Sequence, residues 1–317
     1  MRKGAAEMAY NVFIDGKNGT TGLKIREYLA PREDINIIDI DEDKRKDMDE
    51  KLRKIKEADV SLLCLPDNAS VETAAAAPSD ARIIDTSTAH RTNDDWVYGM
   101  PELCPGQREK IRNSARVANP GCHATGFILL VRPLVEAGII PADYPLAAFS
   151  VTGYSGGGKK MIANHEKEDR DSFLVSPGQY GLTQDHKHRR EMVKAAGVSA
   201  EPSFCPVVGD FYAGMAVTVP LQSRCLPGGP GIDEIRNVYN NYYAGEKLIE
   251  VAGGDPDDGF IHADILAGSN KYQIFVSGND ERPLLISRFD NLGKGASGAA
   301  VQNMNIMLGI EETKGLI

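Results

Sequence analysis

The stretch that decides the fold is Asp15-Gly16-Lys17-Asn18-Gly19-Thr20-Thr21-Gly22, which follows directly from the short β-rich run Asn11–Asp15. Its pattern, Gly-x-x-Gly-x-x-Gly, is a variant of the dinucleotide-binding fingerprint. Glycines let the backbone approach a pyrophosphate, and a helix that starts there presents free N–H groups to it. A plain glycine-rich turn is the alternative. Because the loop follows the first strand of the chain, we interpret it as a nucleotide site with contacts from Gly16, Asn18, Gly19, Thr20, Thr21 and Gly22.

Around this loop, apolar strand-like runs alternate with helical patterns as far as residue 120. The strand candidates are Ile35–Ile40, Val60–Leu65 and Arg82–Asp85, and the helix candidates are Thr21–Ala30, Asp47–Ala58 and Ala69–Ala77. Nearly continuous apolar strands separated by helices are typical of a parallel sheet that is covered on both faces. The alternation therefore predicts an α/β fold with a Rossmann-type doubly wound parallel sheet.

The second half of the chain has a different texture. Its longest β-like runs are Met215–Leu221, Tyr272–Ser277 and Leu284–Phe289, with a helix candidate at Ile232–Tyr243. Clustered strands with few helices between them predict an α+β domain with a mixed sheet. The last pattern, Ala296–Gly309, has an apolar helical stripe suited to packing on the first domain. We expect residues 8–121 and 296–317 to form a dinucleotide-binding domain, and residues 122–295 a catalytic and dimerisation domain.

Composition excludes several classes of protein. Among the 317 residues, 36 Lys and Arg face 45 Asp and Glu, so the net charge of −9 argues against nucleic-acid or anionic-lipid partners. The five cysteines are odd in number and widely spaced, which indicates neither a disulfide framework nor a zinc site. The apolar run Phe127–Val131 is far shorter than the ~20 residues of a membrane span, and no signal-peptide pattern is visible. We expect a cytoplasmic protein in which residues 1–7 are dispensable and Met8 offers an alternative start.

A second motif, Val117–Gly126 (VANPGCHATG), places Cys122 between an Asn-Pro-Gly turn and the start of an apolar helix. Free N–H groups and the positive end of the helix dipole stabilise a thiolate at such a position. An inert buried cysteine is the alternative, and it is our interpretation of Cys64 and Cys205. We therefore predict that Cys122 is a nucleophile.

The end of the second strand carries signals for cofactor choice. An acid there, as in Asp39-Ile40-Asp41, favours a ribose 2′-hydroxyl, whereas a nearby cation, as in Lys44-Arg45-Lys46, favours a 2′-phosphate. A solvated run of charges is the alternative. Because the basic trio follows where the adenosine ribose should lie, we predict NADP, bound through Arg45.

Two further segments can bind anions or the nicotinamide. Tyr154–Lys160 offers a hydroxyl, flexible N–H groups and two ammonium groups, so we expect Ser155 and Gly156 to contact the cofactor and Lys159 to contact the substrate. At the carboxyl end of the fourth strand, Ser87 could touch the nicotinamide and Arg91 an anionic group. A flexible loop and a surface salt bridge are the respective alternatives.

Taken together, these motifs resemble the N-acetyl-γ-glutamyl-phosphate reductases of arginine biosynthesis, which group with the aspartate-semialdehyde dehydrogenases. The resemblance is closest to the shorter variety and spans nearly the whole chain. It rests on DGKNGTTG at 15–22, DTSTAHR at 85–91, YGMPEL at 98–103, NPGCHATG at 119–126, SGGGKKMI at 155–162, HKHRREM at 186–192 and GASGAAVQNMN at 295–305. The chain departs from the family at His123, where an aromatic residue is common, at Leu130, and in its opening loop.

The resemblance implies further roles for individual residues. It places an acid/base histidine in His186-Lys187-His188, a glutamate, Glu191, at the same site, and Asn303 beside the nicotinamide. It also implies a substrate contact at Asn119 and a homo-oligomer, either a dimer or a tetramer. On a helix over 186–196, His188 and Glu191 share a face at i and i+3, which favours His188 as proton donor, with His186 as the reserve. No metal-ligand spacing is present.

The function implied is NADPH-dependent reduction of N-acetyl-glutamyl 5-phosphate through a Cys122 thioester, with His188 protonating the alkoxide after hydride transfer. In this interpretation His188 acts only at the reduction step, so acylation proceeds without it. Two alternatives stay open. One is the same mechanism on a homologous acyl phosphate, such as aspartyl phosphate or a carrier-bound aminoadipyl phosphate. The other is a non-catalytic nucleotide-binding relative.

Overall fold

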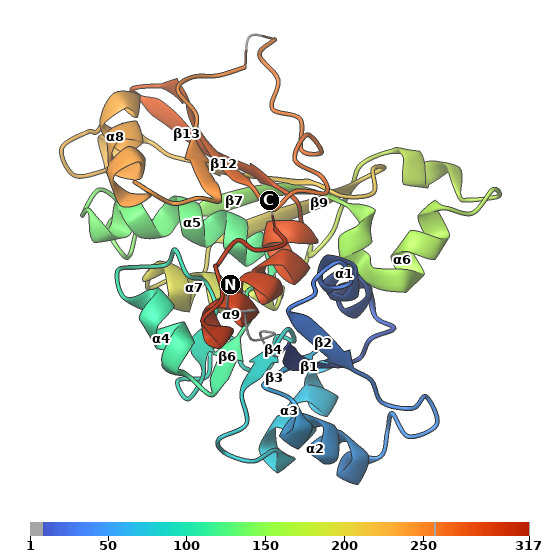
Figure 1. Cartoon of the computed structure of the whole chain (residues 1–317). Coiled ribbons are helices and arrows are strands. Elements are labelled where there is room, and N and C mark those ends of the chain that lie inside the picture. The colour runs from blue at the N-terminus through green and yellow to red at the C-terminus, as the bar shows by residue number, and fades with distance from the viewer. Residues whose placement is uncertain (1–8, 257, 317) are drawn as a thin grey trace, which may run out of the picture.

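The computed structural model describes residues 9–256 and 258–316, so the expectations for residues 1–7 and Met8 lie outside the described residues. Its first sheet has six parallel strands in the order β2-β1-β3-β4-β6-β5 (Figure 1). These strands are β1 Tyr10–Asp15, β2 Ile35–Ile38, β3 Val60–Leu63, β4 Ile83–Asp85, β5 Val97–Tyr98 and β6 Arg116–Ala118. The predicted doubly wound parallel sheet is confirmed.

Helices cover both faces of this sheet because its strands are apolar on both sides. The helices around it are α1 Thr20–Leu29, α2 Met48–Glu57, α3 Asp67–Ala76, α4 Gln107–Asn113 and α9 Gly298–Leu308. Successive side chains of a strand point to opposite faces. Val12 and Ile14 accordingly pack in one apolar cluster with α1 and α9, whereas Phe13 packs in another with Ile55 of α2.

The second sheet is mixed, as predicted, and has seven strands in the order β11-β12-β13-β10-β7-β9-β8. They are β7 Ala147–Gly153, β8 Gly178–Gln179, β9 Ser203–Gly209, β10 Met215–Pro220, β11 Ile249–Val251, β12 Tyr272–Asn279 and β13 Arg282–Phe289. The pairs β7/β9 and β11/β12 are parallel, and the other pairs are antiparallel. The helices of this half are α5 Cys122–Glu136, α6 Gly158–His165, α7 His188–Ala196 and α8 Ile232–Tyr242.

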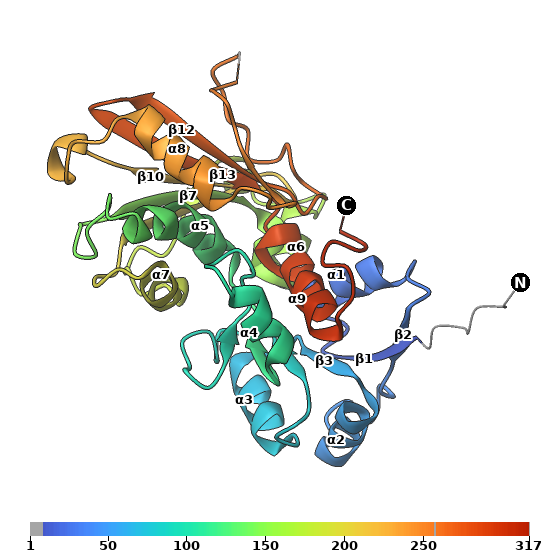
Figure 2. The same ribbon diagram turned by 60° about the vertical axis from the view of Figure 1, so that its left-hand side comes forward.

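Helix α5 fixes the position of the second motif. It packs against β10, β13, α7 and α8, and most of its residues are buried (Figure 2). Burying an apolar side chain in this way contributes about 1.5–3 kcal/mol. The helix is therefore firmly held, and the position of its first residue, Cys122, is fixed with it.

Helix α9 returns to the first sheet. Val301 and Met304 are fully buried in the same cluster as Val12, and α9 packs against α1, α4, β3 and β4 (Figures 1 and 2). The sequence predicted a helix from residue 296, but α9 begins at Gly298 because Gly293–Ser297 winds as a π-helical turn. Such turns inside or beside α-helices occur mainly at functional sites.

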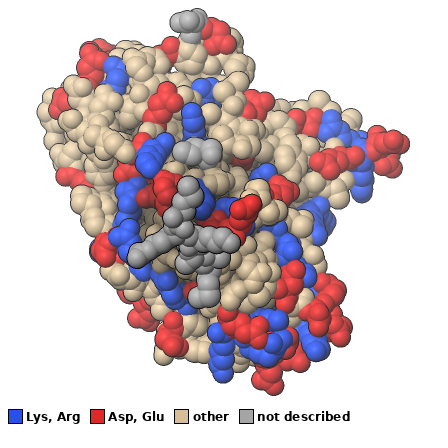
Figure 3. Space-filling view, in the orientation of Figure 1, with Lys and Arg blue, Asp and Glu red and all other residues tan. Residues whose placement is uncertain are grey.

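The surface agrees with the mixed composition. Acidic and basic side chains are interspersed over the face seen in Figure 3, and the lower part around α2 carries both kinds. Within residues 9–256 and 258–316, no helix has the length and apolar character that crossing a membrane requires.

Candidate active site

Cys122 lies in a cavity of about 340 Å³ to which both halves of the chain contribute. The lining includes Thr21, Arg91, Asn119, Cys122, Gly156, His186 and His188. Gly121, the N-cap of α5, allows this assembly because a Cβ at this position would lie 2.5 Å from His188 Nε2. The glycine before the cysteine is therefore required by the close approach of the histidine.

Burial controls the protonation of the thiol. It raises the pKa of Cys122 to about 11, while the Arg91 guanidinium and the backbone N–H groups of the first helical turn act in the opposite direction. The sequence predicted that the helix terminus would stabilise a thiolate, and those N–H groups do favour it. Desolvation is the larger effect, so Cys122 rests as a thiol and needs a base to react.

His188, the first residue of α7, is a candidate base that lines the same cavity as Cys122 and approaches the preceding residue, Gly121. Burial and the neighbouring Arg91 and His123 hold the pKa of His188 well below its ordinary value, so its imidazole is neutral at rest. Its Nδ1 atom is buried and reaches no hydrogen-bond partner among the described residues. A neutral imidazole beside a thiol can accept the thiol proton and later return it.

The sequence predicted a helix over 186–196, which would include His186. In the structure His186 lies just before α7. The helix begins at His188, whose backbone N–H donates to His186 Nδ1 at 3.2 Å. The rings of His186 and His188 are in edge contact, with centroids 4.8 Å apart. Both histidines line the cavity, but only His188 stands next to Gly121.

Glu191 joins three segments beneath the cavity. One of its carboxylate oxygens accepts from the Gly121 N–H at 2.8 Å and from the Tyr98 hydroxyl at 2.6 Å, and the other pairs with Arg91 at 3.1 Å. Glu191 shares a face of α7 with His188, as the spacing predicted, and is only 2% exposed. It does not line the cavity. Its contacts make it a support for Gly121 and Arg91, and its contact with the substrate stays a prediction.

Arg91 is held on three sides yet faces the cavity. Its Nε donates to Asn119 O at 2.8 Å, and a terminal nitrogen donates to Thr86 O at 3.0 Å. A guanidinium has five N–H donors, which is more than the two backbone bonds and the Glu191 pair use. Donors therefore remain for an anionic ligand. Asn119 is fixed in turn, since its side chain donates to Ala296 O at 2.9 Å and accepts from Asn303 at 3.1 Å.

His123 is engaged on both ring nitrogens. Nδ1 is 2.8 Å from the Ser150 hydroxyl and Nε2 is 2.7 Å from the Tyr180 hydroxyl. Burial lowers the pKa of His123 to about 3, with a smaller contribution from His186. His123 is thus a neutral hydrogen-bonding link rather than a proton donor.

The glycine loop forms the other end of the site. Gly16 has φ +88°, and Gly19 at the N-cap offers no side chain, so the first N–H groups of α1 receive no hydrogen bond from a capping side chain. One cavity of about 500 Å³ is lined by Gly16, Asn18, Gly19, Lys17, Arg45 and Lys46. A second, of about 510 Å³, is lined by Gly19, Thr20, Thr21, Ser87, Ser155, Gly156, Cys122 and His188. The second cavity therefore connects the loop with the thiol.

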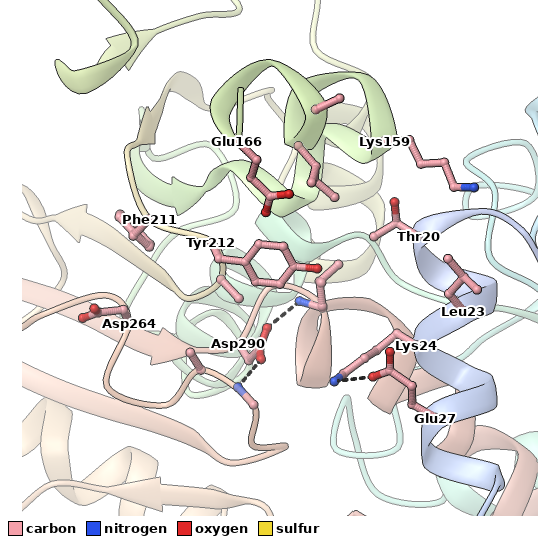
Figure 4. A pocket seen from close by; sticks show the side chains of 16 residues that line it. Thr20, Leu23, Lys24, Glu27, Lys159, Glu166, Phe211, Tyr212, Asp264 and Asp290 are labelled. Carbon is pink, nitrogen blue, oxygen red and sulfur yellow. Dashed lines mark hydrogen bonds and ion pairs between the residues drawn. The ribbon is translucent and has the colours of Figure 1, made fainter. Parts of the chain in front are cut away.

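Not all predicted residues meet in these cavities. Gly22 packs beneath the loop, where a Cβ would lie 2.5 Å from Gly16 O, and Asn303 is fully buried behind Asn119. Lys159 lines a separate cavity of about 750 Å³, where it extends from α6 toward Thr20 in the first turn of α1 (Figure 4). Lys159 is not among the residues that line the two cavities of Cys122, so a contact of Lys159 with the substrate stays a prediction.

The sequence did not single out Lys187, which lines both cavities that contain Cys122. It forms no ion pair within the part of the chain that the structure describes. Tyr180, next to His123, was also missed. Lys187 could have been noticed as a cation between the two histidines, whereas nothing in the local pattern around Tyr180 indicates a site.

Two protein-family models match the chain. The NAD-binding domain of semialdehyde dehydrogenase matches residues 22–114, and the dimerisation domain of semialdehyde dehydrogenase matches residues 122–291. Among solved structures, aspartate semialdehyde dehydrogenase II of Vibrio cholerae has a TM-score of 0.71 at 17% identity, covering 95% of this chain and 99% of that one. The aspartate semialdehyde dehydrogenase of Francisella tularensis has a TM-score of 0.71 at 13% identity, with 94% and 100% covered. At these identities the likeness shows the fold.

Curated relatives are far closer in sequence. N-acetyl-gamma-glutamyl-phosphate reductase 2 of Nostoc sp. is 47% identical over 317 residues, which cover 96% of this chain and 98% of the relative. The N-acetyl-gamma-glutamyl-phosphate reductase of Brucella anthropi is 46% identical, with 95% and 99% covered. With identity at this level over almost its full length, the chain belongs to the semialdehyde dehydrogenase family and, within it, to the N-acetyl-γ-glutamyl-phosphate reductases.

Proposed function

We propose that the chain reduces N-acetyl-glutamyl 5-phosphate to N-acetyl-glutamate 5-semialdehyde with NADPH, through a thioester on Cys122, as a step of arginine biosynthesis. The observation that carries this proposal is the placement of Cys122 and His188, which line both the thiol cavity and the cavity that leads to the glycine loop. A covalent intermediate on a buried thiol separates loss of phosphate from reduction.

The residues of the chain divide the chemistry as follows. His188 takes the proton of the Cys122 thiol as the sulfur attacks the acyl carbon, and the bond to the phosphate oxygen breaks. When bound, NADPH supplies the hydride that reduces the thioester. His188 then returns its proton to the developing alkoxide. As the C–S bond breaks, the hydroxyl proton passes to the sulfur, so the semialdehyde is released and the thiol is restored. Arg91 and Lys187 offer positive charge to the acyl phosphate, and Asn119 offers its fixed amide.

The assignment of the cofactor rests on the loop cavity. The uncapped first turn of α1 suits a pyrophosphate. Neither Asp39 nor Asp41 lines the cavity of about 500 Å³, whereas Lys17, Arg45 and Lys46 do. The two carboxylates that line it, Asp15 and Glu42, are paired with Lys51 and Arg45. Asp39 is occupied by Arg26, with oxygen–nitrogen distances of 2.7 and 3.2 Å. A 2′-phosphate therefore finds cations here, which supports NADP over NAD.

Replacing Arg45 with alanine should weaken NADPH binding about tenfold or more and leave NADH binding within about twofold. Arg45 is half-exposed and, among the described residues, forms an ion pair with Glu42 alone, at 2.8 Å, so a phosphate can displace that weak surface pair. A hydrogen bond to a charged group contributes about 1.5–3 kcal/mol. Dissociation constants from cofactor fluorescence provide the measurement, with Lys56→Ala as the control for lost surface charge. Equal losses for the two cofactors would remove Arg45 from the site.

We also propose that residues 8–121 and 296–317 act as the dinucleotide-binding domain, and that residues 122–295 carry catalysis and the contact between subunits in a dimer or tetramer. The matched dimerisation-domain model supports this assembly. Phe149 supports it too, because this aromatic side chain of β7 is 47% exposed while its neighbours Ala148 and Ser150 are buried. A cytoplasmic location stays a prediction from the sequence.

The direct test of the reaction runs it backwards. N-acetyl-glutamate 5-semialdehyde should reduce NADP over repeated turnovers only when inorganic phosphate is present, because phosphate must displace the acyl group from Cys122 before the next turnover. Aspartate semialdehyde and a carrier-bound aminoadipate semialdehyde provide the comparison. A clear preference for either of these substrates, or repeated turnover of NADP without phosphate, would contradict the proposal.

A further inference from the structure

A buried ion pair lies close to the site, although the mechanism above does not use it. The Lys294 Nζ atom is 2.7 Å from Glu102 Oε1 and 2.7 Å from Gln302 Oε1, and Gln302 also donates to Glu102 at 2.8 Å. The side chains of Lys294 and Glu102 are only 3% and 1% exposed. No described residue reaches the second carboxylate oxygen of Glu102.

Stability alone does not explain such a pair. Taking two charges out of water costs several kcal/mol for each ion, and replacing a buried pair by apolar residues of similar volume is often neutral or stabilising. The pair therefore calls for a reason other than stability. Buried ionic groups can serve to specify one arrangement of the elements that they join.

The arrangement in question is the π-helical turn Gly293–Ser297, of which Lys294 is the second residue. Three contacts tie this turn to the reacting groups. A Cβ at Gly295 would lie 2.9 Å from Cys122 Cβ, so the backbone there packs directly on the nucleophile. Ala296 O accepts from Asn119 at 2.9 Å, and Ser297 donates to Thr21 O at 3.2 Å. The turn thus touches the thiol, the NPGC motif and the glycine loop.

Glu102 approaches from the opposite side, in the segment that follows β5. Tyr98, the last residue of β5, donates from its hydroxyl to Glu191, and the carbonyl of the next residue, Gly99, accepts from Asn303 at 2.7 Å. The Glu102–Lys294 pair therefore links two supports of the site across the interior. Each support reaches Cys122 or its neighbour Gly121 by a short chain of contacts.

We propose that Glu102 and Lys294 are positioning residues that hold the Gly293–Ser297 turn against Cys122. The pair thereby maintains the spacing between the thiol, Asn119 and the glycine loop that hydride transfer requires. This inference rests on the proposed role of Cys122. A displacement of about 1 Å in the reacting groups can cost about 100-fold in rate. The pair acts through the backbone of the turn and touches no substrate.

The test is the double variant Glu102→Gln/Lys294→Met, which removes both charges and preserves side-chain length. We expect its urea midpoint to stay at the wild-type value, its kcat to fall at least tenfold and its KM to change less than about twofold. Alkylation of Cys122 by iodoacetamide should become faster, because the turn no longer packs against Cys122 and the thiol becomes more exposed. Faster alkylation together with slower turnover is not expected of a pair that only stabilises the fold.

The control is Arg132→Met/Glu136→Gln, which neutralises a more exposed pair at the far end of α5, the helix of Cys122. It should leave kcat and alkylation unchanged. Wild-type kcat in a well-folded Glu102→Gln/Lys294→Met protein would overturn the inference. If that variant does not fold, Lys294→Arg is tested instead, because it keeps the positive charge but changes the length and shape of the side chain. A native urea midpoint with unchanged kcat in Lys294→Arg would overturn the inference equally. A wild-type protein without reductase activity would instead refute the proposed function.

Discussion

Cys122→Ser should abolish semialdehyde formation, with a loss of at least about 10⁴-fold in kcat, while NADPH binds as it does to the wild type. A serine hydroxyl ionises far less readily than a thiol, and its ester is a poorer hydride acceptor than a thioester. Removing a covalent nucleophile therefore costs several orders of magnitude. Oxidation of NADPH measures the first quantity and fluorescence titration the second. The glycine loop does not depend on the sulfur, which is why the two quantities should separate.

The matched control is Cys205→Ser, the same chemical change in β9 of the second sheet, which should turn over normally. Iodoacetamide provides an independent check, because it should inactivate the wild type and the Cys205→Ser variant equally. Substantial turnover by Cys122→Ser would refute the thioester mechanism and leave the fold assignment untouched.

The fold could be predicted because its determinants are local. The glycine loop after the first strand, and the alternation of apolar strands with helices, require neighbours only a few residues apart in sequence. Boundaries differed where hydrogen bonding departs from the regular pattern. The π turn at Gly293–Ser297 delays the start of α9, and His186 is left outside α7. Neither feature changes the hydrophobic periodicity from which the helices were predicted.

The site was harder to predict from the sequence than the fold, because tertiary packing brings its residues together. Lys159 follows a glycine loop that lines the cavity, yet the turn of α6 carries its ammonium group into a different cavity. Glu191 was expected to bind substrate, but burial directs its carboxylate to Gly121, Tyr98 and Arg91. Cys122 could be found because a helix start after Asn-Pro-Gly is itself a local signal. The raised pKa of Cys122 could not be predicted, because desolvation depends on the surrounding fold.

That raised pKa changes what is expected of His188. From the sequence, His188 protonates the alkoxide and leaves acylation unaffected. In the structure, burial puts the pKa of the Cys122 thiol at about 11 and holds the pKa of His188 well below its ordinary value of about 6.5. At neutral pH both groups are uncharged, so the thiol cannot attack unless a base takes its proton. His188 therefore serves both steps, first as base and then as acid.

His188→Asn should accordingly slow the release of phosphate from the acyl phosphate by about 100-fold or more at pH 7, within the range of general-base catalysis. As the pH rises toward 11, the fraction of Cys122 thiolate grows about tenfold per pH unit, and phosphate release by the variant should recover in parallel. Semialdehyde formation should not recover, because the alkoxide still lacks its donor. Wild-type phosphate release should stay nearly flat between pH 7 and 9, since the thiol proton passes to His188 within the site.

Single-turnover measurements of phosphate and of NADPH oxidation distinguish the outcomes. His186→Asn is the control. It should release phosphate at nearly the wild-type rate, because His188, and not His186, is the histidine packed against Gly121. If His186→Asn instead shows the pH-dependent defect, the proton partner is His186. A fast phosphate burst from His188→Asn at pH 7 would mean that the thiol ionises without that histidine. Helix N–H groups and Arg91 would then outweigh desolvation at Cys122, in the direction that the sequence alone had indicated.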